Sequence, residues 1–162
     1  MVEDNKQAGK DLLDRIAGEE ARLVFDVFDE TTALALGMRL VEAARSVHAP
    51  VVIDIRTPDR TLFHVAMPGS APDNDVWARR KSNVALRIHH ASMWVGENNR
   101  LKGRKLGPEL GFDPLDYADH GGSFPIRVRS VGVVAAVTVS GLASADDHAM
   151  IIDALEAHLG TA

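Results

Sequence analysis

The stretch DHGGSFPI, at residues 119–126, introduces two predicted strands and a closing helix. Residues 124–129 and 131–139 are rich in apolar and β-branched side chains and pair naturally around Ser130, which predicts a hairpin. Residues 145–159 then carry apolar side chains about four positions apart, as an amphipathic helix does. Two adjacent glycines ahead of a strand give a backbone that another group can approach closely. The stretch therefore predicts a fold and a candidate pocket.

The rest of the chain places strands mostly in adjacent pairs, with helices between the pairs. Periodicity and turn residues predict, in order, a surface helix at 5–20, a strand at 22–29, a helix from Ala33 to Val47 capped by Thr31 or Thr32, a hairpin of 51–56 and 61–67, a helix at 74–93 capped within 73–75, and an irregular segment at 96–114. A parallel α/β fold separates consecutive strands by helices, so this order fits it badly. We expect one α+β domain over residues 1–162, with residues 1–21 as an N-terminal helical extension.

Composition narrows the class of protein further. The chain has 162 residues, 46% of them hydrophobic, which suffices for one domain with a real core. Its net charge of −5 gives no overall basic character, so we expect no nucleic-acid partner. The absence of cysteine excludes disulfides, thiol catalysis and cysteine-ligated metal sites. The polar first residues, and the lack of an apolar run of about 18 residues, predict no signal peptide, no membrane span and a cytoplasmic protein.

The predicted helix at 74–93 contains a basic residue where an apolar one is expected. At about 100° per residue, Trp77, Val84 and Ile88 fall on one stripe. Lys81 lies in the middle of that stripe. A lysine in this position either extends past the edge of the core into solvent or points into a pocket and meets an anion.

Two other groups of basic residues accompany this lysine. Arg80 and Arg87 share the flank beside it, one above the other. If that flank faces a cleft, the site is cationic and suits carboxylates or phosphates. Residues 97–105 form a second basic run, which is either a solvated loop or a binding patch, because long irregular segments in compact domains are often functional.

His120, Gly121 and Gly122 are the other candidate site. A glycine pair allows backbone N–H groups to face a ligand, and a histidine can act as an acid, a base or an axial ligand of haem iron. A glycine pair before a strand also forms simple bulges. Both interpretations remain open at this stage.

Other histidines and acids have simpler explanations. His89 and His90 cannot easily share a metal ion, because neighbouring helical residues point about 100° apart, which favours a surface or interface role. Asp113, Asp116 and Asp119 recur every third residue, but they lack the internal glycine that a hard-cation loop needs. We expect these acids to form turns.

The start of the closing helix has a complete local explanation. Ser144 and Asp147 match the spacing of a capping box, which accounts for the aspartate structurally. His148 lies in the first turn, where the helix dipole favours a neutral imidazole. Such an imidazole could ligate iron, or it could pack against a neighbouring subunit.

Three runs in the C-terminal half resemble the haem-degrading-domain family, which is also called GlcG/HbpS-like. They are GGSFPIRV from Gly121, GVVAAVTVSGL from Gly132 and DDHAMIIDAL from Asp146. The NDVW segment at 74–77 and the following Arg-Lys pair are similar to that family's middle helix, and resemble its small cytosolic branch of uncharacterised proteins. The resemblance covers about residue 20 to the end.

This resemblance implies a profilin-like α/β/α sandwich around a central antiparallel sheet. It also implies homo-oligomers, often dimers built up into larger rings. Some members of the family bind haem or iron, so haem is a candidate cofactor. The motif is more specific for the fold than for an activity.

Three functional hypotheses follow. The first is a small-ligand or haem-binding protein whose pocket lies between the 74–93 helix and His120. In this hypothesis Trp77, Gly121 and Gly122 line the pocket, Lys81, Arg80 and Arg87 meet haem propionates or another anion, and His120 or His148 ligates iron. The second is a homo-oligomeric assembly module without catalysis. The third is an enzyme acting on a small anionic substrate, with Lys81 and His120 as acid and base.

Overall fold

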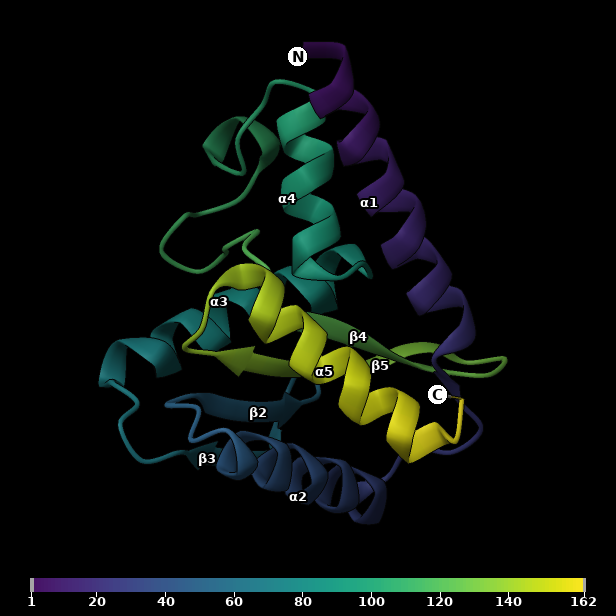
Figure 1. Cartoon of the computed structure of the whole chain (residues 1–162), viewed down its shortest axis with the longest axis vertical. Helices are drawn as coiled ribbons and strands as arrows, with labels where there is room; N and C mark the ends of the chain where they lie inside the picture. Colours follow the sequence, from purple (N-terminus) through teal and green to yellow (C-terminus); the bar gives the residue numbers. More distant parts are fainter. Residues whose placement is uncertain (1, 162) are drawn as a thin grey trace.

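The computed structural model describes residues 2–161, which form the expected α+β arrangement (Figure 1). The elements are α1 (Val2–Arg22), β1 (Val24–Phe25), α2 (Glu30–Ser46), β2 (Val52–Arg56), β3 (Thr61–Ala66), α3 (Pro72–Ile88), α4 (Ser92–Leu101), a short 3-10 helix (Pro108–Leu110), β4 (Ser123–Val128), β5 (Gly132–Ser140) and α5 (Ser144–Leu159). Both predicted hairpins and the closing helix are confirmed, because their apolar periodicity agrees with their tertiary burial.

The strands of this part of the chain form one sheet in the order β1-β4-β5-β2-β3. β1 runs parallel to β4, and every other pair of neighbours is antiparallel. The sheet is therefore mixed, with an antiparallel centre. In its register, Asp54 of β2 lies between His64 of β3 and Thr138 of β5.

Helices cover both faces of the sheet, which confirms the α/β/α sandwich. α2 and α5 pack together on one face, and α3 packs across β5, β4 and β2 on the other (Figure 1). The main core lies on the α2–α5 side, where Leu36, Ile53, Ile55 and Phe124 are buried. Because side chains alternate along a strand, Asp54 projects from β2 toward the face that α3 covers. The α3 side of the sheet is thus the polar side.

The prediction of one helix over 74–93 is wrong, and the segment predicted to be irregular at 96–114 is so only after Leu101, apart from the short 3-10 helix. α3 ends at Ile88, because His89 adopts a left-handed conformation with φ 63° and donates its N–H to Ala85 O. α4 then begins at Ser92, inside the predicted helix, and runs to Leu101, inside the predicted loop. Histidine tolerates this conformation better than a β-branched residue does, but it carries no sequence signal as clear as glycine.

Two boundaries near the N-terminus also differ from expectation. The strand predicted at 22–29 is reduced to Val24–Phe25, an edge strand that pairs only with β4. The cap of α2 is Asp29 rather than Thr31 or Thr32. The Asp29 carboxylate accepts hydrogen bonds from both the N–H and the hydroxyl of Thr32, each at 2.9 Å, and so takes the capping role.

α1 packs against α4 and does not lie apart from the domain (Figure 1). Ile16 is fully buried, and Gly9 approaches Glu97 and Leu101 of α4 so closely that a Cβ atom there would displace their side chains. The narrow apolar stripe predicted for this helix therefore packs against the domain, mainly against α4. No helix in the described range is both long and apolar enough to cross a membrane.

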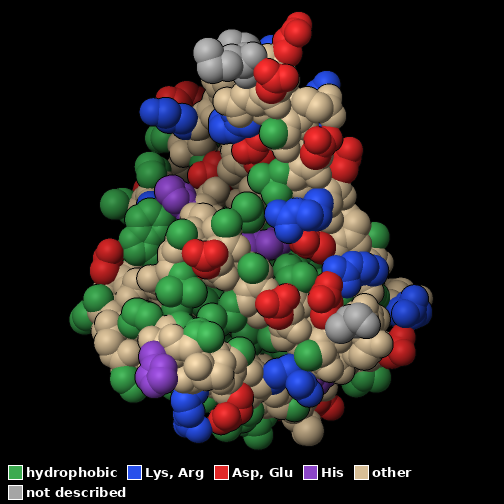
Figure 2. All heavy atoms as spheres, in the orientation of Figure 1, with side chains coloured by type: hydrophobic (Ala, Val, Ile, Leu, Met, Phe, Trp, Pro, Cys, Tyr) green, Lys and Arg blue, Asp and Glu red, His purple; other side chains and the backbone are tan. Residues whose placement is uncertain are grey.

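The face that carries α2 and α5 has mixed surface chemistry (Figure 2). Acidic and basic side chains are interspersed over it, and hydrophobic side chains gather between the two helices. A nucleic-acid site requires a continuous basic surface. The described residues on this face do not present one.

Candidate functional site

Lys81 is buried, so it is the pocket lysine of the two alternatives. Its side chain is 3% exposed, and its Nζ atom donates to Gly121 O at 3.1 Å, Val139 O at 2.7 Å and Asp147 Oδ2 at 3.1 Å. An ammonium group has three N–H donors, and all three have partners here. The side chain thus joins α3 to β5, to the loop before β4 and to the start of α5.

Asp147 does not form the predicted capping box. α5 begins after Ala143 without a side-chain cap, and the Asp147 carboxylate instead accepts from Lys81, from Leu142 N at 3.0 Å and from Gly141 N at 3.3 Å. Burial lowers the pKa of Lys81, opposed by the charge of Asp147, and burial likewise raises the pKa of Asp147, opposed chiefly by Lys81. The filled hydrogen-bond shells on both sides support an ionised pair.

The two glycines make room for this ion pair. Gly122 has φ +120°, and a Cβ atom there would collide with Lys81 Nζ and Val139 O. A Cβ on Gly121 would collide with the Ser144 backbone. The close approach that the glycine pair predicts is therefore confirmed, but the groups that approach belong to the protein itself.

His120 lies beside this pair with free hydrogen-bonding capacity. It is exposed, and its ring meets Trp77 edge-on, with the centroids 5.0 Å apart. Within residues 2–161, neither of its ring nitrogens has a hydrogen-bond partner. The Arg80 guanidinium carbon lies 4.4 Å from the Trp77 ring centroid, and the buried Arg80 Nε also lacks a partner there. Two side chains with an unpartnered nitrogen, His120 and Arg80, thus lie against the Trp77 indole.

Two hollows meet at His120, and they share Gly121 and Ser144 as well. The smaller has a volume of about 220 Å³ and is lined by Asn74, Trp77, Lys81, His120, Gly121, Ser140, Gly141, Leu142, Ser144 and Asp147. The larger, which we call the α1–α4 cleft, has a volume of about 730 Å³ and is lined by Leu12, Met93, Gly96, Glu97, Asn99, Arg100, Arg104, Lys105, Leu106, Asp119, His120, Gly121 and Ser144. His120 and Lys81 therefore line one hollow.

A buried asparagine organises the wall of the α1–α4 cleft. Asn99 is 3% exposed, and its amide donates to Asp119 Oδ2 at 2.8 Å and accepts from Arg104 Nε at 2.8 Å. Arg100 is paired with Glu97, whereas Arg104 and Lys105 have no ion pair in the described range. The cleft consequently has two available positive charges on one rim. They lie in the basic run 97–105, of which the first residues are helical.

Three of the predicted basic or histidine side chains line neither hollow, and Arg80, which lies over Trp77, is the first of them. His148 is 1% exposed, and its Nε2 atom is hydrogen-bonded to Glu19 Oε2 of α1 at 2.8 Å, so it lines neither hollow. Arg87 stacks over the Phe112 ring, 4.0 Å from its centroid, and donates to Gly111 O. The shared flank of Arg80 and Arg87 thus does not face one cleft.

The remaining histidines and acids form no metal cluster. His90 bonds to Glu20 and stacks on Trp94. Asp113 caps the turn at Leu115, as predicted, and the carboxylates of Asp116 and Asp119 bond to Arg79 and Asn99. No group of three or more His, Asp or Glu side chains between residues 2 and 161 could hold a metal ion.

Sequence reasoning missed several residues of the site. The capping pattern assigns Asp147 a local role, although a lysine among apolar residues signals that a buried acid lies nearby. The sequence shows Arg104 and Lys105 only as part of a basic run. For Asn74 and Ser144, the sequence suggests only helix capping and gives no indication that they line a pocket.

The fold of this chain is an α/β/α sandwich built on one sheet. Its candidate site is a histidine at the junction of two open hollows. The family model described as haem degrading protein HbpS-like matches residues 28–156. The chain belongs to this family.

Relatives of known sequence or structure agree with this family. The UPF0303 protein SCO2848 of Streptomyces coelicolor is 51% identical over 142 residues, which cover 88% of this chain and 90% of that protein. The crystal structure of Ybr137w protein has a TM-score of 0.82 at 35% identity and covers 91% of this chain and 87% of that one. The PduOC:heme complex has a TM-score of 0.67 at 20% identity, covering 83% and 95%, and so shares the fold.

Proposed function

We propose that the protein binds haem in the α1–α4 cleft, with His120 as the axial ligand of the iron. The observation that carries this proposal is the exposed His120, whose ring nitrogens have no partner among residues 2–161, at the mouth of a hollow of about 730 Å³. A neutral imidazole nitrogen is a common ligand of haem iron. Membership of the HbpS-like family and the fold shared with the PduOC:heme complex support the same ligand.

The chemistry of the cleft suits a flat, apolar ring with acidic substituents. Leu12, Met93 and Leu106 supply apolar contact area for a macrocycle. Arg104 and Lys105, which have no ion pair in the described range, can meet carboxylates such as haem propionates. The cleft therefore offers apolar walls, a cationic rim and one free imidazole.

Lys81 has a supporting role in this proposal. All three of its donors have protein acceptors, so it holds the loop that carries His120 and does not itself contact the ligand. The same filled shell removes the main support for an enzyme in which Lys81 acts as acid or base. A catalytic lysine needs a free or transferable proton near the substrate.

A hemin titration followed by absorbance tests the proposal. The unaltered protein should bind saturably with a shifted Soret band, and His120→Ala should lose that shift. His89→Asn is the matched control, because His89 is another exposed histidine that lies outside both hollows. Asparagine also tolerates its left-handed backbone.

A second variant separates propionate contacts from iron ligation. Arg104→Gln/Lys105→Gln should weaken hemin affinity but leave the Soret position of the bound form unchanged. An absence of saturable binding by the unaltered protein would overturn the proposal. An unchanged Soret shift in His120→Ala would overturn the role of that histidine.

We also propose that the chain forms a homo-oligomer through α2 and the edge strand β3. Leu34 and Met38 are 56% and 48% exposed and lie one turn apart on α2. The same side of the helix continues to Val41, which lines an apolar hollow together with Val65 of β3. An exposed apolar stripe beside an unpaired strand edge favours association with a second copy. The sedimentation coefficient of the protein at micromolar concentration tests this proposal.

A further inference from the structure

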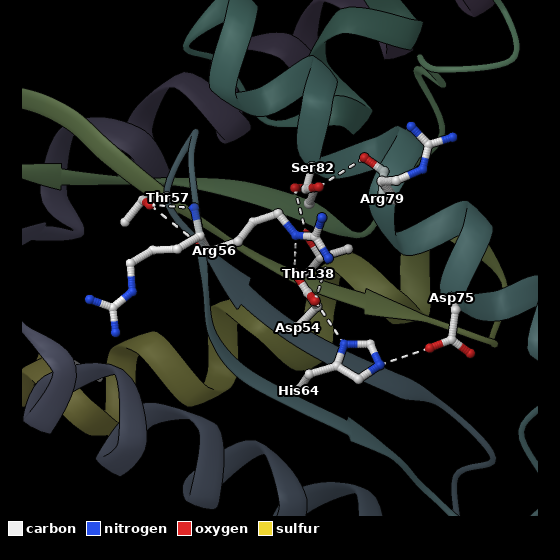
Figure 3. Close-up of polar contacts among 10 residues, drawn as sticks. Asp54, Arg56, Thr57, His64, Asp75, Arg79, Ser82 and Thr138 are labelled. Atoms are coloured by element: carbon white, nitrogen blue, oxygen red, sulfur yellow. Dashed lines mark hydrogen bonds and ion pairs between the residues drawn. The ribbon is translucent and has the colours of Figure 1, made fainter.

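A polar network joins the β2–β3 hairpin to the first turn of α3 (Figure 3). Asp54 is fully buried at the centre of β2, and its carboxylate accepts from Arg56 Nε at 2.6 Å and from a terminal nitrogen of Arg56 at 2.7 Å. His64 faces Asp54 across the strand pair. Its Nδ1 atom lies 2.8 Å from Asp54 Oδ2, and its Nε2 atom lies 2.7 Å from Asp75 Oδ1.

The geometry around His64, with a carboxylate oxygen at each ring nitrogen, favours a doubly protonated ring. A neutral imidazole has one N–H group and can donate to only one of the two carboxylates, whereas the imidazolium donates to both. Burial opposes the charge, but the hydrogen bonds and charges of Asp54 and Asp75 outweigh it and raise the pKa of His64 above its ordinary value. The charged groups bonded within this network, among residues 2–161, are Asp54 and Arg56 from β2 and Asp75 from α3.

The network acts on the segment that forms one wall of the candidate site. Asp75 lies in the first turn of α3, Asn74 precedes it, and Trp77 follows two residues later. Asn74 and Trp77 both line the smaller hollow, and Trp77 contacts His120. The position of this turn therefore fixes the indole against which the proposed iron ligand packs.

We propose that His64 is a positioning residue whose protonation holds the first turn of α3 in place, so that its deprotonation weakens ligand binding at His120. The ligand-binding part of this inference rests on the proposed function. No contact between His64 and the ligand is involved, since His64 does not line either hollow.

The direction of the pH effect follows from the raised pKa. A histidine whose pKa is higher in the folded state stabilises that state fully below its unfolded pKa of about 6.5. This contribution is lost as the pH rises through the folded value. The first turn of α3 should accordingly be held firmly below a pH of about 6.5, and should loosen as the pH rises through the His64 transition.

Two measurements without ligand test the positioning role. NMR titration of the histidine ring protons should show His64 titrating above its ordinary value. Hydrogen exchange of the amides in 72–78, corrected for the intrinsic pH dependence, should accelerate through the same transition. If the corrected exchange rate of the amides in 72–78 stays constant while His64 titrates, the inference is overturned.

Asp75→Asn is the matched variant. An amide can either accept from or donate to the ring, so a neutral His64 is accommodated and the fold is retained. We expect the His64 pKa to fall and the exchange of 72–78 to become nearly independent of pH. His64→Gln, which cannot titrate, should also give pH-independent exchange. A pH-dependent change in 72–78 that persists in both variants would assign the effect to another group.

The coupling to the site is measured as a ratio of hemin dissociation constants, unaltered protein over Asp75→Asn, at each pH. This ratio cancels the titration of His120 and of hemin itself, because both proteins contain them. It should increase about fivefold or more as the pH passes the His64 transition. A constant ratio would overturn the coupling. If neither the unaltered protein nor any variant binds hemin, only the proposed function is overturned. The positioning role is still tested by the NMR titration and by hydrogen exchange, which need no ligand.

Discussion

At the scale of single residues, the buried pair of Lys81 and Asp147 dominates the candidate site. Both side chains are 3% exposed, so each depends on its partner to offset the loss of water. We predict that Lys81→Met lowers the free energy of unfolding by about 3–5 kcal/mol, because it leaves the Asp147 carboxylate buried and unpaired. Urea denaturation followed by circular dichroism measures this change.

A double variant separates the lost pair from lost packing. Lys81→Met/Asp147→Asn removes both charges while the amide oxygen can still accept from Leu142 N. The double variant should be more stable than Lys81→Met alone, although it contains one more substitution. If it is less stable than the single variant, the unpaired carboxylate is not the source of the cost.

The same residues explain how much of the site could be predicted. A lysine on an apolar stripe is anomalous within a single helix, so the sequence identifies Lys81 as unusual but leaves open whether it reaches solvent or enters a pocket. Its acceptor Asp147 is 66 positions away, and a local capping pattern offered a nearer explanation for that carboxylate. Local patterns compete with tertiary partners, and one sequence holds no information on which of them prevails.

At the scale of elements, α1 is attached to the domain by two adjacent buried glutamates. Glu19 bonds to His148 of α5, and Glu20 bonds to His90 at 2.8 Å and to Ala91 N at 2.6 Å. We predict that Glu20→Ala lowers the free energy of unfolding by about 1–3 kcal/mol, because it leaves the buried Ala91 N–H at the start of α4 without an acceptor. Amide exchange in α1 should accelerate in parallel.

Asp14→Ala is the control for this prediction. Asp14 is exposed on the same helix and has the same charge as Glu20. It should change neither the stability nor the exchange of α1 appreciably. Equal effects of the two substitutions would mean that net charge, and not the contact with α4, holds the helix.

The elements themselves were predictable where local periodicity and tertiary burial agree. The hairpins and α5 meet this condition. The break between α3 and α4 does not, because it depends on one left-handed residue, His89, in a sequence without glycine or proline at that point. The contact between Asp54 and His64 could not be predicted from the sequence either, because it depends on the register of β2 against β3.

At the scale of the whole molecule, the N-terminal helix α1 contributes to the wall of the candidate site. The family match covers residues 28–156, so α1 lies outside it. Leu12 of α1 nevertheless lines the α1–α4 cleft opposite α4. The depth of the proposed haem site therefore depends on α1 as well as on α4.

The oligomeric state is the remaining property of the whole molecule, and it follows from the exposed stripe on α2. Leu34→Glu/Met38→Glu places two like charges where the proposed interface is apolar, so the sedimentation coefficient should shift toward that of a 17.5 kDa monomer. Leu115→Glu is the matched control, because Leu115 is 76% exposed but lies far along the chain in the segment before β4. It should leave the assembly unchanged. A monomeric unaltered protein, or equal dissociation by both variants, would contradict an interface on α2, and the exposed leucine and methionine would then be ordinary surface residues.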